Sequence, residues 1–317
     1  MTTLLRSLQA ADERHVAIGH FNVSELVTLK AVVSAAQHVA VPVIIGVSEG
    51  ERQYLGTREI ASFVAAIRSE SSVPVYLNAD HTHSLEKTEE AARAGFDLIV
   101  FDASELPFEQ NAAATRRAVE AAKSIRPEIL VEGEIGYIGS GSEIHDQAAK
   151  TTPILTTPEE ARQFANQTRV DLLAPAVGTT HGMLRSMVAG QSQKHLDIDR
   201  IAAIKQSTHL FLTLHGGSGT NDDDFRRAIQ AGITVIHINT ELASPGVAGS
   251  KLSSVSILTK SCPINCSLQP NWKWKKSSSA ACDYSTASPH RGAAPASPRS
   301  AERRHSLVFS ARPSRDG

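Results

Sequence analysis

Residues 73–102 read VPVYLNADHTHSLEKTEEAARAGFDLIVFD and contain one complete strand–helix–strand pattern. The ends, 73–79 and 97–102, are aliphatic and β-branched without polar alternation, as expected of strands buried on both faces of a parallel sheet. The middle segment spaces its apolar residues at helical intervals and closes on Ala94–Gly95, a typical helix C-terminus before a strand. The stretch therefore predicts one repeat of a parallel α/β fold.

The same rhythm extends over the first 242 residues. Apolar runs lie at 15–23, 41–47, 73–79, 97–102, 128–133, 171–177, 209–214 and 233–240, with helical patterns between them. Eight strands that each expect a helix predict a (β/α)8 TIM barrel. A doubly wound sheet would show a Gly-rich turn after its first strand, but here that strand leads straight into FNVSELVTL. One long connection, 138–158, is rich in Gly, Ser and Thr and indicates a functional or mobile loop.

The barrel pattern stops after residue 242, so two parts are predicted: a barrel over 1–242, lacking a regular eighth helix, and a tail over 243–317. The tail holds 7 of the 14 prolines, 17 serines, and 11 Lys+Arg against 3 Asp+Glu, whereas the barrel part carries 21 against 30. This composition predicts a disordered or aberrant segment, for example a shifted or intron-derived reading frame. Its three cysteines lack a fourth ligand at a suitable spacing for zinc, and its lysines around Trp272 and Trp274 are a weak indication of nucleic-acid binding.

The bulk composition excludes several classes of protein. A net charge of −1 and a hydrophobic fraction of 41% fit a chain with a sizeable core and favour no charged partner. The N-terminus lacks the apolar run of a signal peptide, and no stretch approaches the roughly 20 apolar residues of a membrane span. With no cysteine before residue 262, no disulfide framework is expected. We expect a soluble, cytoplasmic protein that binds neither membrane nor nucleic acid.

His81, His181 and His215 each come at or just after the end of a predicted strand. The carboxyl ends of barrel strands form the face on which these folds build their sites. Three imidazoles that converge there and leave one coordination position open would form a catalytic zinc site. Any one of them taken alone would more often be a surface or hydrogen-bonding histidine than a metal ligand.

Five motifs, in order, extend the pattern: NADHTHSLEKTEEAARAGFDLIVFDASELPFEQN, ILVEGEIGYIG, DLLAPAVGTTHG, LHGGSG and HINTEL. Together they make residues 1–242 similar to the class II fructose- and tagatose-bisphosphate aldolases. The resemblance implies that His81, His181 and His215 bind one Zn²⁺. It also implies reversible aldol cleavage of a ketose 1,6-bisphosphate to dihydroxyacetone phosphate and glyceraldehyde 3-phosphate, a lyase reaction of carbohydrate metabolism such as glycolysis. Family members are homodimers or larger assemblies.

The resemblance also assigns proton transfer. Asp80 matches the family's catalytic aspartate, and a carboxyl group beside the metal can exchange a proton with the hydroxyl on carbon four. The alternative for Asp80 alone is a helix N-cap. Glu143, in GYIGSGSEIHD, is the nearest candidate for the base that acts on the dihydroxyacetone carbon, although it lies one place from the family position. His237 replaces a common asparagine and is expected to be structural or to contact substrate, not to be a fourth ligand.

The remaining candidate residues surround this centre. Metal-bound histidines need acceptors for their second nitrogen, which strand-end carboxylates can supply if they are not merely solvated or paired with Lys or Arg. These candidates are Asp102, Glu132 and Glu134. Loops after the seventh and eighth strands usually bind phosphate in this fold, and the candidates there are Gly216, Gly217, Ser218, Asn239 and Thr240. The resemblance further suggests that Gly182 contributes backbone to this region and to a monovalent cation, Na⁺ or K⁺, and that substrate contacts come from Asn22 and Ser48.

Two other functions are compatible with the sequence. One is a catalytically impaired homologue, a pseudoenzyme, because the altered C-terminus replaces a region that family enzymes use to cover the barrel. The other is a different sugar-phosphate barrel enzyme such as a metal-dependent epimerase. A Schiff-base mechanism is not indicated, since Lys205 is expected in a connection between a helix and a strand.

Overall fold

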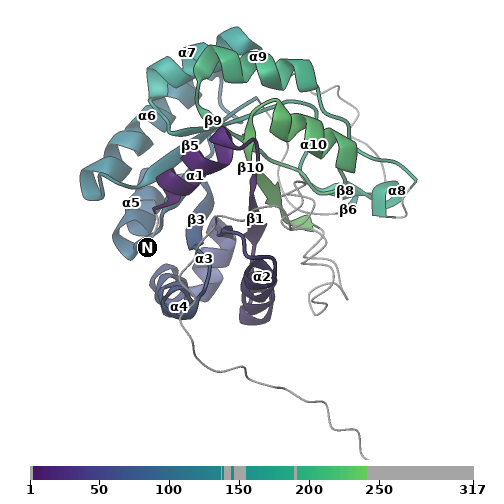
Figure 1. Cartoon of the computed structure of the whole chain (residues 1–317). Coiled ribbons are helices and arrows are strands. Elements are labelled where there is room, and N and C mark those ends of the chain that lie inside the picture. Colours follow the sequence, from purple (N-terminus) through teal and green to yellow (C-terminus); the bar gives the residue numbers. More distant parts are fainter. Residues whose placement is uncertain (1–2, 137, 139–143, 146–154, 189–190, 241–317) are drawn as a thin grey trace, which may run out of the picture. The chain divides into compact units, whose positions relative to one another are not determined.

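The predicted (β/α)8 barrel is confirmed by a computed structural model, which describes residues 3–136, 138, 144–145, 155–188 and 191–240. Eight parallel strands close into a barrel in the order β1-β10-β9-β7-β5-β4-β3-β2 (Figure 1). Their bounds are Ile18–Asn22 (β1), Val43–Ser48 (β2), Val75–Thr82 (β3), Leu98–Phe101 (β4), Leu130–Ile135 (β5), Leu172–Pro175 (β7), Phe211–Leu214 (β9) and Ile233–Ile238 (β10). Each strand lies within or next to a run predicted from the sequence.

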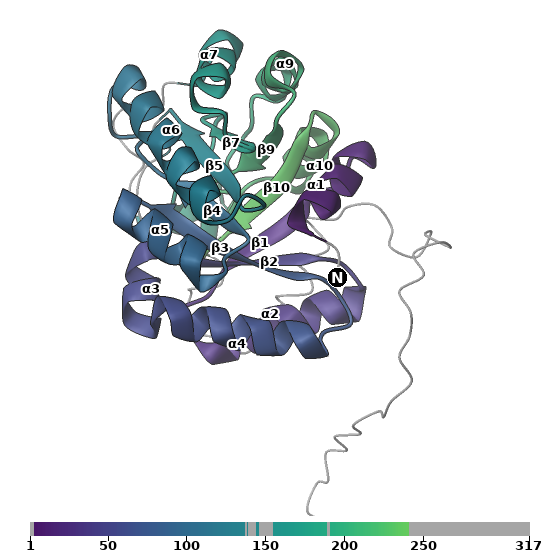
Figure 2. The same cartoon turned by 90° about the vertical axis from the view of Figure 1, so that its left-hand side faces the viewer.

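The barrel is wrapped by helices, and at least one follows each of its first seven strands (Figure 2). The helices are α1 (Leu4–Glu13), α2 (Leu26–Val39), α3 (Glu49–Leu55), α4 (Thr57–Glu70), α5 (Leu85–Ala94), α6 (Phe108–Ile125), α7 (Pro158–Thr168), α8 (Arg185–Val188), α9 (Ile198–Thr208) and α10 (Asp222–Gln230). None of these described helices is long and apolar enough to cross a bilayer. The predicted tail, 243–317, lies outside the described residues.

Local capping signals explain where the helices begin and end. Helix α5 starts at Ser84, whose side chain accepts a hydrogen bond from the Lys87 amide, and ends at Gly95 in the left-handed conformation. Helix α7 starts with a reciprocal capping box between Thr157 and Glu160. Lys205 was expected in a connection, but it lies inside α9, because that helix continues to Thr208.

Helix α1 was not predicted, and it closes the amino-terminal end of the barrel. Its apolar residues Leu4, Leu8 and Ala11 are spaced for one helical face, which is the signal that could have revealed it. They form one cluster with buried residues from the amino-terminal halves of seven strands, namely Ile18, Ile44, Tyr76, Leu98, Leu130, Leu172 and Val235. The barrel is therefore sealed at the end opposite to the predicted site.

The barrel interior turns polar towards its carboxyl end. Successive inward residues of a strand are two apart, so the apolar Leu130 is followed on the same side by Glu132 and Glu134. In the same way Tyr76 is followed by Asn78 and Asp80, and all of these polar side chains are buried. Such a strand is buried along its length, although the inward-facing residues near its carboxyl end are polar.

A small second sheet lies in the connections after β5 and β7. Strand β6 (Ile144–His145) pairs in parallel with β8 (Met183–Leu184). It ties the long connection that follows β5 to the connection that carries His181. Glu143, the predicted base, lies next to β6 but outside the described residues.

The packing between the helices and the barrel can be tested by a substitution at Phe164. Its ring is fully buried, lies edge-on to Phe108 with the ring centroids 6.1 Å apart, and fills the space above Gly133. Phe164→Ala is expected to lower the free energy of unfolding by about 3 to 5 kcal/mol, because it leaves a cavity in a closed core. Phe63→Ala is the matched control, since Phe63 is 43% exposed on α4. Urea denaturation of both variants measures the difference, and equal losses would contradict the packing.

Candidate metal and active site

Three histidines converge at the carboxyl end of the barrel. His81 is the penultimate residue of β3, His181 follows β7 and His215 follows β9. Their ring centroids lie 4.9, 5.2 and 5.6 Å apart, and the ring planes cross at 71° to 88°. The rings do not stack on one another, and each offers a nitrogen within 4.8 Å of the others, which is compatible with binding one metal ion.

Carboxylates fix the outward-facing nitrogens of two of these histidines. His81 Nδ1 lies 2.8 Å from Asp102 Oδ2, and His215 Nε2 lies 2.7 Å from Glu132 Oε1. Because those nitrogens are engaged, His81 Nε2 and His215 Nδ1 are left for the interior of the cluster. His181 contributes Nε2, which is buried and has no hydrogen-bond partner among the described residues. Asp102 and Glu132 thus contact the second ring nitrogens for which they are the predicted acceptors.

Glu134 lies closer to the centre than expected. Its carboxylate and His81, His181 and His215 each offer one ligand atom, and these atoms all lie within 4.8 Å of one another. Glu134 Oε2 is 3.2 Å from His215 Nδ1 without the geometry of a hydrogen bond. This carboxylate can therefore act as a fourth metal ligand, whereas Asp102 and Glu132 contact histidine nitrogens.

The electrostatics of the cluster suit a cation. Burial alone would lower the pKa of His81, but the charge of Asp80 and the hydrogen bond with Asp102 outweigh it and raise the pKa to about 9. Burial also opposes protonation of His215, yet Glu132 and Glu134 raise its pKa well above the ordinary value. The carboxylates thus favour positive charge here, and a bound metal ion would supply it after displacing protons from these two rings.

Asp80 lies beside the cluster with its orientation fixed. Its Oδ2 accepts a hydrogen bond from Asn22 Nδ2 at 2.8 Å, and its Oδ1 lies 3.5 Å from His237 Nδ1. Burial alone would raise the pKa of Asp80, but the charges of nearby histidines, His81 first, hold it well below the ordinary value. The carboxylate is therefore ionised and can accept a proton. The side chain does not act as a helix cap, because Ser84 caps α5.

His237 belongs to a stack of three imidazoles. Its ring lies 3.5 Å from that of His20 with an angle of 9°, and 4.1 Å from that of His215. Burial lowers the pKa of His20 to about 4 and that of His237 well below the ordinary value, so both rings stay neutral. His20 was not predicted. Its Nε2 contacts Asn78 Nδ2 at 2.8 Å, and its ring occupies the space that a side chain at Gly46 would need.

The glycine-rich loop after β9 carries unpaired polar groups. Ser218 is 3% exposed, and its Oγ has no hydrogen-bond partner in the described part of the chain. Thr220 Oγ1 is likewise buried and unpaired there. Buried hydroxyls in this state are available to bind a ligand or a water molecule, because leaving them unsatisfied is costly. Gly216 and Gly217 lie in the same loop, and Asn239 and Thr240 follow the neighbouring strand β10.

Ser48, predicted to contact substrate, also has a structural role at a helix end. It forms the N-cap of α3 in a capping box with Glu51. Lys194 was also not singled out, although it is 6% exposed and its Nζ contacts the backbone carbonyl of Gly182 at 2.7 Å. A lysine in a connection between strand and helix carries no pattern that predicts burial, so only the structure reveals this contact.

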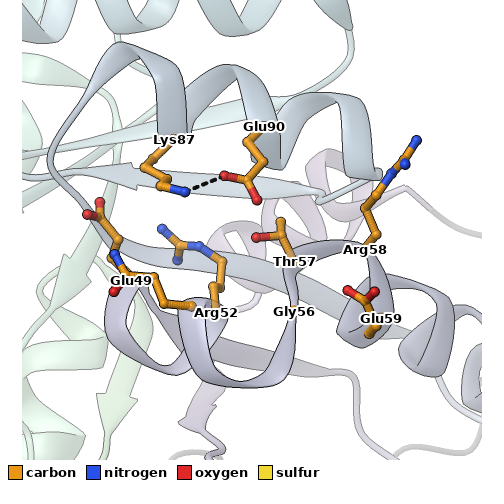
Figure 3. Close-up of a pocket in the computed structure, with 9 residues that line it drawn as sticks. Glu49, Arg52, Gly56, Thr57, Arg58, Glu59, Lys87 and Glu90 are labelled. Atoms are coloured by element: carbon orange, nitrogen blue, oxygen red, sulfur yellow. Dashed lines mark hydrogen bonds and ion pairs between the residues drawn. The ribbon is translucent and has the colours of Figure 1, made fainter. Parts of the chain in front are cut away.

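Arg52 anchors the end of β3 from outside the barrel. It is 3% exposed and donates to the carbonyls of Val47 and Asp80 and to Thr82 Oγ1. Figure 3 shows Arg52 in a polar pocket of about 340 Å³, where Lys87 and Glu90 of α5 form an ion pair 2.7 Å apart. None of the histidines of the cluster lines this pocket. Its link to the site is the Arg52 contact with the Asp80 backbone.

A closed (β/α)8 barrel with ionisable residues at the carboxyl ends of its strands is the architecture of a barrel enzyme. The chain matches the model of the family Fructose-bisphosphate aldolase class-II over residues 2–270. It is 35% identical over 244 residues to a probable fructose-bisphosphate aldolase of Bacillus subtilis (strain 168), covering 76% of this chain and 82% of that protein. Identity and coverage are the same for a fructose-bisphosphate aldolase of Staphylococcus aureus (strain Mu50 / ATCC 700699).

Two solved structures share the fold. A putative fructose-1,6-biphosphate aldolase from Coccidioides immitis aligns with a TM-score of 0.70, and the YdjI aldolase from Escherichia coli K12 with 0.66. Each is 26% identical and covers 82% of this chain and 96% of its own. The chain belongs to the class II fructose-bisphosphate aldolase family. Its members are enzymes of the lyase class, so aldolase function is supported and the pseudoenzyme alternative is not.

Arg52→Met is expected to lower the free energy of unfolding by about 2 to 4 kcal/mol, because it leaves buried acceptors at the ends of β2 and β3 without their donor. Arg58→Met is the matched control, since Arg58 lines the same pocket but is exposed on α4. It should change stability by less than about 0.5 kcal/mol. Thermal or urea unfolding compares them, and a tolerated Arg52→Met would rule out the anchoring role.

Proposed function

We propose that the chain catalyses the zinc-dependent, reversible aldol cleavage of a ketose 1,6-bisphosphate to dihydroxyacetone phosphate and glyceraldehyde 3-phosphate. The observation that carries this proposal is the histidine cluster. Three mutually perpendicular imidazoles, two with their second nitrogen on a carboxylate, lie beside an ionised Asp80. Family membership supports the aldolase reaction, and the donor set supports the metal.

The donor set fits Zn²⁺. Imidazole nitrogens with one carboxylate oxygen are ligands that zinc prefers, and the buried Nε2 of His181 lacks a partner among the described residues. His81, His181 and His215 would hold the ion, with Glu134 near enough to join them. Bound Zn²⁺ supplies a Lewis acid that polarises a carbonyl group.

In this proposal Asp80 removes the proton from the hydroxyl on carbon four as the bond between carbons three and four breaks, and returns it in the condensation direction. Nearby histidines hold the pKa of Asp80 below its ordinary value, so the carboxylate is ionised and is in the form that can accept this proton. The Asn22 hydrogen bond holds one carboxylate oxygen and leaves the other for substrate. Glu143 as the base for the dihydroxyacetone carbon stays a prediction from the sequence.

The phosphate group is assigned to the loops after β9 and β10. The unpaired Ser218 hydroxyl and the backbone of Gly216 and Gly217 can cradle an anion there. Asn239 and Thr240 lie at the adjoining strand end, where phosphate sites of this fold usually lie. A homodimeric state, a cytoplasmic location and a place in glycolysis also stay predictions from the sequence.

Metal removal tests the first half of the proposal. Cleavage of fructose and tagatose 1,6-bisphosphates should fall by more than about 100-fold after chelation and return with about one Zn²⁺ per chain. His181→Ala should lose the metal, whereas His38→Ala, an exposed histidine on α2, should keep it. Metal content and cleavage are measured on the same samples. The preferred sugar identifies the configuration accepted at carbon four, and cleavage by metal-free protein would disprove zinc dependence.

Asp80→Asn tests the second half. The amide keeps the shape of the side chain but cannot take a proton, so kcat should fall by about 10²- to 10⁴-fold while zinc content is unchanged. Asp199→Asn, on the exposed face of α9, is the control and should retain kcat. A normal kcat in Asp80→Asn would assign the proton transfer to another residue. Exclusive epimerisation without cleavage in the unmodified protein would instead revive the epimerase alternative.

A further inference from the structure

Lys194 inserts a buried amino group between the loops that carry two of the clustered histidines. Its side chain is 6% exposed. Its Nζ lies 2.6 Å from Thr180 O, 2.7 Å from Gly182 O and 2.9 Å from Gly216 O. A neutral amine has only two N–H groups, so three acceptors at these distances require the charged ammonium form.

The three carbonyls approach one another because glycine lets the loops touch. Gly216 has φ of +62°, and a Cβ atom there would lie 2.5 Å from Thr180 O. Gly182 also has a positive φ, of +75°. Carbonyl dipoles that face one point repel each other unless a cation lies between them, and a ring of backbone carbonyls is how proteins hold K⁺. This cradle is therefore a site for one monovalent positive charge.

The backbone of Lys194 is fixed independently of its side chain. Its amide donates to Gly219 O at 2.9 Å, and its carbonyl accepts from the Asn221 amide at 3.4 Å. Lys194 thus pairs with the glycine loop after β9 on one side and, through Nζ, with both neighbours of His181. The charge and the two loops form one connected unit.

We infer that Lys194 supplies, from within the chain, the monovalent cation of this site. The ammonium occupies the contact with Gly182 at which the family resemblance suggested Na⁺ or K⁺, and the two occupants exclude each other. Lys194 is a positioning residue: it fixes His181, His215 and the glycine loop and places positive charge next to the proposed phosphate position. This last role rests on the proposed function. The chain should therefore need no monovalent metal ion.

The experiment uses three proteins: the unmodified protein, Lys194→Ala and Lys194→Met. Each is measured in tetramethylammonium chloride and in samples in which K⁺, Na⁺ or NH₄⁺ replaces the tetramethylammonium ion at constant ionic strength. The melting temperature, the affinity for inorganic phosphate, and the KM and kcat for the preferred bisphosphate are measured. Lys205→Ala is the matched control, because Lys205 is a half-buried lysine of α9 that pairs with Asp12 at 2.7 Å.

For the unmodified protein, the phosphate affinity, KM and kcat should each change by less than about two-fold among the salts, and none of the ions should raise the melting temperature saturably. Lys194→Ala should bind phosphate about ten-fold or more weakly, raise KM more than it lowers kcat, and recover saturably with K⁺ or NH₄⁺. Its melting temperature should rise with the same ions, as expected for a ligand of the folded state. Lys194→Met should show the loss without recovery, since its side chain fills the cradle. Losses in Lys205→Ala should not respond to these ions.

A saturable stimulation or stabilisation of the unmodified protein by K⁺ or Na⁺ would overturn the inference, and this result needs no variant to fold. Lys194→Ala that behaves like the unmodified protein, or that is impaired equally in all salts, would overturn it as well. The melting and phosphate measurements do not depend on cleavage. If no bisphosphate is cleaved but only Lys194→Ala responds to K⁺, the proposed function fails and the assignment of Lys194 stands.

Discussion

The pairing of ionisable groups inside the barrel is the constraint on which the site depends. His215 is completely buried, with Glu132 2.7 Å from Nε2 and Glu134 3.2 Å from Nδ1. None of these groups could be buried alone in its charged form without a large desolvation cost. With Asp80 and Asp102 nearby, four carboxylates surround three histidines, so the interior has an excess of acceptors. A cation at the centre of the cluster compensates this excess, and without one the protein must keep protons on its imidazoles. Metal affinity and the stability of the polar interior are therefore aspects of the same charge balance.

Two buried cations hold the backbone around this charge balance from different sides. Arg52 reaches from α3 to the carbonyl of Asp80, immediately before His81. Lys194 reaches the carbonyls on both sides of His181 and the one after His215. Both act on main-chain oxygens, so each fixes where a histidine's Cα lies without touching its ring. The rings of His81 and His215 are then oriented by Asp102 and Glu132. For these two histidines the backbone is placed by a basic residue and the ring is oriented by an acidic one, so the second ring nitrogen stays available to a metal ion.

The barrel, its strand order and the three clustered histidines were predictable because they depend on short-range periodicity and on where strands end. Asp102 and Glu132 were also predictable as acceptors, since strand-end residues of a barrel share one face. The contacts of Lys194, Arg52 and His20 were not. Each joins residues distant in sequence, and a buried lysine or arginine looks like a surface one until its carbonyl partners are known. His20 and Asn78 carried a faint signal, as polar residues inside otherwise apolar strands. Helix α1 was missed because a short amphipathic stretch before the first strand does not interrupt the repeat.

The packing of the His20 side chain against Gly46 connects β1 and β2 in addition to their backbone pairing. A Cβ atom on Gly46 would lie only 2.2 Å from Cε1 of His20, and the His20 ring stacks on His237 of the neighbouring strand β10. Any side chain at position 46 therefore requires a smaller residue at position 20, and a smaller residue at position 20 leaves His237 without its stacking partner. The three positions are coupled, so natural variation should replace them together. Covariation among positions 20, 46 and 237 would then mark the members of the family whose barrel interior is built on stacked imidazoles.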